Sequence, residues 1–199
     1  RIGPAGVPEW LTLLTCTFLH GGVLHFLGNM LFLWIFGDNV EDRFGPVKFL
    51  LFYLGCGVAA SAAHLYSAPD SVVPTIGASG AIAGVMGAYL FLYPRSRVLA
   101  LIPFGFVFLD VVLPAPFFLG YWFLLQLFQG VVDRGVGGGV AWWAHIGGFI
   151  AGVALIVPMK RKNVALFDRG LKRFTLRPGA SRRTRIPKSG HSGPKGPWS

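Results

Sequence analysis

Charge is scarce in this sequence: only 13% of its 199 residues are charged, against about 25% in a typical soluble domain. There are only two cysteines, both in apolar stretches, which argues against a disulfide-stabilised scaffold. Apolar residues make up 53% of the chain and the mean hydropathy is +0.59, so disorder is excluded for most of it. The 28 glycines are typical of closely packed transmembrane helices. These features indicate a membrane protein.

The formal net charge of +10 does not predict a nucleic-acid partner, because the basic residues are unevenly placed. Twelve of the 18 lysines and arginines lie between Lys160 and Lys195, whereas residues 1–159 hold six basic and seven acidic residues. We therefore interpret residues 159–199 as a basic, disordered cytoplasmic tail. The tail either contacts anionic lipid headgroups or only fixes the membrane topology.

Five apolar segments approach the roughly 20 residues that a helix needs to cross a bilayer. They run from about 19–37, 47–66, 79–93, 116–130 and 140–157. Residues 99–113 are also apolar, but Pro103 interrupts them and they carry Asp110. We expect an interfacial or re-entrant segment there rather than a further span.

The basic residues between the predicted spans give their orientation. If the five helices alternate, the connections that carry Arg43 and Arg95 lie on the same side as the basic tail, which the positive-inside rule makes cytoplasmic. The N-terminus then lies outside, and the chain begins with Arg1 instead of Met. We therefore expect a fragment that lacks the first transmembrane helix.

Polar side chains inside membrane spans are costly, so they are candidates for function. His25 and Asn29 are four residues apart and share one face of the first span. Ser79 begins the third span, and His145 lies near the outer start of the fifth. Interhelical hydrogen bonding, or helix capping by Ser79, would account for each residue alone. Their similar depth on three helices favours one shared site.

The third span is too short to cross the bilayer core. From Ser79 to Tyr93 it covers about 15 residues, or roughly 22 Å, against a core of roughly 30 Å. Arg95 fixes its inner end at the cytoplasmic interface, so Ser79 is expected below the outer surface. Irregular backbone at that depth requires protein or water around it, which predicts a hydrated pit with Ser79 at its floor.

Glycines four residues apart provide a way to bring the third and fifth spans together. Gly80 and Gly84 form one such face, and Gly148 and Gly152 form another. If these faces pack, His145 approaches the start of the third span.

The candidate residues suit hydrolysis by a serine nucleophile. A hydroxyl needs a base to take its proton, and His145 fits that role for Ser79. No acidic residue lies in the outer half of a predicted helix, so we expect a dyad instead of a triad. Asn29, His25 and the backbone N–H of Ser79 could stabilise an oxyanion. Zinc binding by the histidines lacks a convincing third ligand, so no metal is expected.

Four motifs resemble those of the rhomboid intramembrane serine proteases. They are HGGVLHFLGN at residues 20–29, GDNVEDRFG at 37–45, GASG at 77–80 and AHIGGFIAG at 144–152. The resemblance covers residues 8–158 and keeps the order of the family's motifs. It implies an all-α, polytopic membrane helical bundle with five of the usual six core helices. Residues 1–18 would then end an external loop, and residues 19–158 would form the membrane protease domain.

The resemblance also implies roles for the residues that match these motifs. Ser79 would be the nucleophile and His145 the base, with His25, Asn29 and the Ser79 amide at the oxyanion site. Glu41 and Arg43 would be structural and would tie the cytoplasmic turn. The glycines that we expect to have structural and packing roles are Gly77, Gly80, Gly84, Gly148 and Gly152. Substrates would be single-span membrane proteins, cut without a cofactor in a bacterial inner membrane.

One departure from the family concerns how the base is held. Some members place an aromatic residue four positions after the serine, where it stacks on the histidine, but this chain has Ala83 there. The main alternative function is a non-catalytic rhomboid-like protein that binds membrane clients. Such relatives usually lose the serine or histidine, and both are present here. A proton-relay transporter would spread ionisable residues through the membrane depth, whereas here they cluster in one half.

Overall fold

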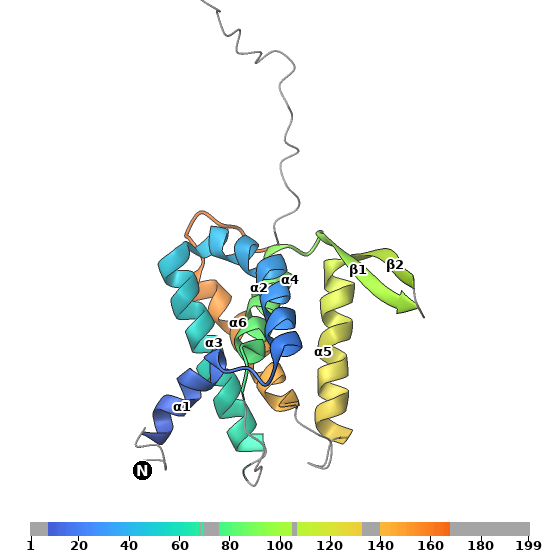
Figure 1. Cartoon of the computed structure of the whole chain (residues 1–199). Coiled ribbons are helices and arrows are strands. Elements are labelled where there is room, and N and C mark those ends of the chain that lie inside the picture. Colours follow the sequence, from blue (N-terminus) through green and yellow to red (C-terminus); the bar gives the residue numbers. More distant parts are fainter. Residues whose placement is uncertain (1–7, 68, 70–75, 105–106, 133–139, 168–199) are drawn as a thin grey trace, which may run out of the picture.

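The computed structural model describes residues 8–67, 69, 76–104, 107–132 and 140–167 (Figure 1). Within these ranges the chain forms six α-helices, one short 3-10 helix and two strands. In order, they are α1 (Glu9–Thr15), η1 (Cys16–Phe18), α2 (Val23–Phe44), α3 (Pro46–Ser67), α4 (Ser79–Leu92), β1 (Arg97–Phe104), β2 (Val107–Pro114), α5 (Ala115–Val132) and α6 (Trp142–Met159).

The predicted bundle of membrane helices is confirmed, and each of the five expected spans corresponds to one helix. Four helices (α2, α3, α5 and α6) are long and apolar enough to cross a membrane, and α4 is a shorter apolar helix. The bundle exposes large apolar side chains on its outer surface, among them Leu24, Trp34, Leu51 and Phe128. Such an extensive apolar exterior fits contact with lipid acyl chains.

The first span is longer than its apolar run predicts. We expected it to end at residue 37, but α2 continues through the charged residues 38–43. The helix stops at Gly45, whose φ of +86° favours glycine and whose N–H donates to the carbonyl of Glu41. Pro46 then begins α3, a position where its missing N–H costs nothing.

A polar cluster ties the end of α2 to the end of α4. The Nε of Arg43 donates to the Tyr93 hydroxyl at 2.8 Å, and that hydroxyl donates to the Asn39 carbonyl at 2.8 Å. Arg161 also donates its N–H to the Arg43 carbonyl. We call Arg43, Tyr93 and Asn39 the Arg43–Tyr93 cluster.

The beginning of the predicted tail packs on this end of the bundle, and residues 168–199 lie outside the described residues. The N–H of Phe167 donates to the Phe91 carbonyl, and their rings lie 5.5 Å apart.

Residues 97–114 form an antiparallel β-hairpin, a secondary structure that the sequence did not lead us to expect. Arg97 pairs with Pro114 at its base, and Phe104 pairs with Val107 at its tip. The hairpin projects sideways from one end of the bundle, next to the start of α5 (Figure 1). It is two paired strands of eight residues each and not a membrane-spanning helix, and it exposes apolar side chains including Leu99 and Phe108.

Helix α4 occupies the centre of the bundle and packs most extensively on α6 (Figure 1). Nearly all of its residues are buried, and many are glycine or alanine. A Cβ at Gly148 would collide with the Gly80 carbonyl, and one at Gly152 would collide with the Gly84 carbonyl. The two predicted glycine faces therefore meet with their backbones in direct contact.

Candidate active site

Close packing of α4 on α6 brings Ser79 and His145 together. Ser79 is the first residue of α4, and His145 lies in the first turn of α6. The Nε2 of His145 lies 2.8 Å from the Oγ of Ser79, which is hydrogen-bonding distance, and both residues are partly buried. A hydroxyl paired in this way with an imidazole can be activated as a nucleophile.

The second ring nitrogen of His145 contacts a residue that sequence reasoning missed. Its Nδ1 lies 2.7 Å from the Oε1 of Gln126 on α5, and the Gln126 side chain is only 7% exposed. A carboxylate is the usual third member of such a site, so a neutral amide was not predicted there. The signal that could have revealed Gln126 was an amide among apolar residues of the predicted span, one helical turn after Trp122.

His25 lies at the start of α2 with a defined tautomer. The backbone N–H of Gly21 donates to its Nδ1 at 3.3 Å, so the ring proton must reside on Nε2. That Nε2 faces Gly77, where a Cβ would lie only 2.9 Å from it, and Gly77 has a φ of +124°. The ring also meets His20 edge-on at 5.4 Å. The donor N–H of His25 thus lies next to the loop that leads into Ser79.

Asn29 is buried one turn after His25 and faces the same space. Its Nδ2 donates one hydrogen bond to the His25 carbonyl at 2.8 Å, and its side chain is 7% exposed. An amide nitrogen carries two donor hydrogens, so this bond uses only one of them. Asn29 can therefore offer a second N–H to a group bound beside Ser79.

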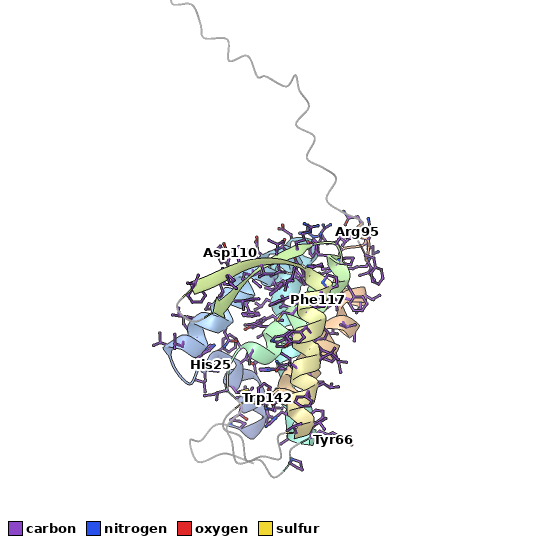
Figure 2. All side chains as sticks on the ribbon, turned by 90° about the vertical axis from the view of Figure 1, so that its right-hand side faces the viewer. His25, Tyr66, Arg95, Asp110, Phe117 and Trp142 are labelled. Carbon is purple, nitrogen blue, oxygen red and sulfur yellow. The ribbon has the colours of Figure 1, made fainter. Side chains whose placement is uncertain are left out.

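A cavity of about 390 Å³ joins these residues. Ser79, His145, His25 and Asn29 all line it, together with apolar walls that include Trp122. Figure 2 shows His25 nearer to the Tyr66 end of the bundle than to the Arg95 end. The cavity thus lies in the half of the bundle away from the hairpin. Among the described residues, no three His, Cys, Asp or Glu side chains gather into a metal site.

Most of the remaining predicted residues lie outside the cavity. Arg43 belongs to the Arg43–Tyr93 cluster at the opposite end of α4 from Ser79, and Glu41 accepts the backbone bond that ends α2. Gly80, Gly84, Gly148 and Gly152 form the contact between α4 and α6. Gly77 and Gly80 also line the cavity, and Gly77 lies beside the ring of His25.

Comparison with known proteins identifies the family. Residues 7–162 match the Rhomboid domain. The chain is 36% identical to Rhomboid protease GluP of Bacillus subtilis over 75% of its length, 32% identical to RHOMBOID-like protein 4 of Arabidopsis thaliana over 74%, and 30% identical to Rhomboid protein 1, mitochondrial, of Saccharomyces cerevisiae over 74%. It spans only 27%, 33% and 41% of those relatives' own lengths. The chain therefore belongs to the rhomboid family and is a multi-pass membrane protein.

Proposed function

We propose that this protein is an intramembrane serine endopeptidase that cleaves single-span membrane proteins with a Ser79–His145 dyad. The observation that carries the proposal is the 2.8 Å contact between Ser79 Oγ and His145 Nε2, on the wall of a cavity. The similarity to Rhomboid protease GluP of Bacillus subtilis supports the same reaction class. Non-catalytic client binding requires neither the hydroxyl nor the imidazole to be in contact.

The first step is attack by Ser79 on the scissile carbonyl carbon. His145 takes the hydroxyl proton at Nε2 while the Oγ–carbon bond forms, which gives a tetrahedral intermediate and an imidazolium. The C–N bond then breaks, and His145 returns the proton to the departing amine. Water, deprotonated by the same imidazole, attacks the acyl-enzyme, and the proton passes back to Ser79 as the acid is released.

Three donors that line the cavity are assigned to the carbonyl oxygen as it becomes negative. They are the Nε2–H of His25, the second Nδ2–H of Asn29 and the backbone N–H of Ser79. The Ser79 amide is available because the first N–H groups of a helix have no intrahelical acceptor. Each such donor is worth about 2.7–4 kcal/mol in the transition state.

The buried position of the site limits which substrates can react. A carbonyl within a transmembrane helix is hydrogen-bonded to its own backbone and covered by side chains, so the scissile segment must unwind before Ser79 can reach it. We propose that the end with Arg43 and Arg95 faces the cytoplasm, because basic residues concentrate there. The membrane we propose is a bacterial inner membrane, with the basic residues after Met159 on its cytoplasmic side.

Reconstitution with a model single-span substrate tests the proposal. Wild-type protein should cleave it, and Ser79→Ala and His145→Ala should each abolish cleavage while remaining folded. A serine-directed fluorophosphonate probe should label wild-type protein and fail to label Ser79→Ala. Equal cleavage by all three proteins would show that Ser79 and His145 do not form the catalytic dyad. Retained binding of the client without any cleavage by the wild type would instead favour the non-catalytic function.

A further inference from the structure

Gln126 is an unusual residue at its position, because it is a buried amide on an apolar membrane helix. Removing an amide from water is unfavourable unless it is hydrogen-bonded. The contact of its Oε1 with the Nδ1 of His145, at 2.7 Å, provides that partner. Its neighbour on the same helix, Gln129, is exposed, so burial of an amide is not general along α5.

The contact decides which nitrogen of His145 carries the proton. An amide oxygen can only accept a hydrogen bond, so the Nδ1 that faces it must be protonated. A neutral imidazole has one proton, so the Nε2 that faces Ser79 then presents its lone pair. This is the tautomer that can accept the hydroxyl proton, and it persists as the imidazolium forms because Nδ1 stays a donor.

Trp122 lies one turn before Gln126 and restrains the same ring. Its indole lies 5.8 Å from the His145 imidazole at an angle of 35°. The family position that sometimes supplies an aromatic to this histidine is Ala83 here. Helix α5 thus contributes both an acceptor for Nδ1 and an aromatic surface for the ring.

We propose that Gln126 is a positioning residue that holds His145 in the Nδ1–H tautomer, in the place where a serine triad would use a carboxylate. The inference rests on the proposed peptidase function, since it assigns a role to the base of that reaction. Gln126 touches no reacting atom and acts only through His145.

The test compares three variants on α5 in the intact, reconstituted protein. Gln126→Met keeps the side-chain length but removes the strong acceptor, and Gln126→Glu keeps an acceptor. Gln129→Met makes the first change at the exposed position. We expect Gln126→Met to lower kcat by about ten- to a hundredfold with little change in KM. Gln126→Glu should retain more activity than Gln126→Met, and Gln129→Met should match the wild type.

A spectroscopic readout makes the test independent of proteolysis. In protein labelled with 15N-histidine, the His145 signals, assigned by comparison with His145→Ala, report the protonated nitrogen of the neutral ring. We expect Nδ1–H in the wild type, in Gln126→Glu and in Gln129→Met, and a shift toward Nε2–H in Gln126→Met. Thermal unfolding in detergent confirms that each variant is folded.

The two proposals fail in different ways. If Ser79→Ala still cleaves, Ser79 is not the nucleophile and the proposed peptidase mechanism is wrong. The 15N spectra still show in that case whether Gln126 sets the tautomer of His145. If Ser79→Ala is inactive but Gln126→Met and Gln129→Met agree in kcat and in their spectra, the role of Gln126 is overturned. A lower kcat in Gln126→Met with an unchanged His145 tautomer overturns it too, because the effect would then arise from packing.

Discussion

Two asparagines on α2 make the same local hydrogen bond in different surroundings. Asn29 donates from Nδ2 to the carbonyl four residues earlier at 2.8 Å, and Asn39 does the same at 3.1 Å. Only Asn29 lines the cavity. A helix-stabilising effect of this bond would be shared by both residues, whereas an effect on the reaction belongs to Asn29 alone.

We therefore expect Asn29→Ala to lower kcat by about 100- to 1,000-fold, which corresponds to losing one oxyanion donor. Asn39→Ala should leave kcat unchanged, because its backbone carbonyl still accepts from Tyr93. Cleavage of a reconstituted single-span substrate at saturating concentration measures both. Similar kcat values for the two variants would argue against an Asn29 contact with the transition state.

Gly77 is required by both its conformation and its neighbour. Its φ of +124° is strained for any residue with a Cβ, and that Cβ would lie 2.8 Å from the Cε1 of His25. Gly77→Ala should cost about 1–3 kcal/mol in stability and displace the His25 donor, so that kcat falls as well. Gly22 is the matched control, because it has extended backbone and open space around it.

Thermal unfolding in detergent and cleavage assays should therefore separate Gly77→Ala from Gly22→Ala. If Gly77→Ala matched Gly22→Ala in unfolding temperature and in kcat, the alanine would neither strain the backbone nor displace His25.

At the scale of helices, the contact between α4 and α6 determines whether the dyad forms. Gly152 lies two turns beyond His145, and a Cβ there would meet the Gly84 carbonyl. Gly152→Ala must push the helices apart, which costs about 1–3 kcal/mol and separates Ser79 from His145. Gly120→Ala on α5 is the control, since nothing lies within 4 Å of its Cβ position.

Fluorophosphonate labelling of Ser79 and the unfolding temperature should thus both fall in Gly152→Ala and not in Gly120→Ala. Labelling at the wild-type rate in Gly152→Ala would show that the helices can separate without disturbing the dyad.

The sequence predicted the helices well because long apolar runs can be read directly, and it predicted the glycine faces because their spacing matches the helical period. It misplaced the end of α2, since the first charged residue marks the end of the apolar run and not the end of the helix, which stops at Gly45. It gave no secondary structure to residues 97–114, because a short apolar run interrupted by Pro103 fits several conformations.

Within the site, too, some residues could be predicted from the sequence and one could not. Ser79, His145, His25 and Asn29 were predicted because each is a chemically active side chain in an apolar context. Gln126 was missed because its role depends on which side of α5 faces α6, and that rotation is set by tertiary packing. A neutral amide also has no intrinsic acid–base chemistry, so a role for Gln126 can be inferred only from its contact with His145.

Across the whole molecule, α4 links two polar ends with different roles. Ser79 and the cavity lie at its first residue, and the Arg43–Tyr93 cluster holds its last turn to α2. Figure 2 shows Arg95 at one end of the bundle and Tyr66 at the other. Because 14 residues, or roughly 21 Å of helix, separate Ser79 from Tyr93, stability and chemistry should respond separately to changes at the two ends.

Tyr93→Phe tests this separation. It removes the acceptor of the Arg43 bond and the donor to Asn39, so we expect a loss of about 1–3 kcal/mol and a lower unfolding temperature in detergent. At temperatures where the variant is folded, its kcat should equal that of the wild type. Tyr66→Phe is the control, because Tyr66 is 89% exposed. A reduced kcat in folded Tyr93→Phe would mean that α4 transmits changes at the Arg43–Tyr93 cluster to Ser79, because no atom of the cavity is altered directly.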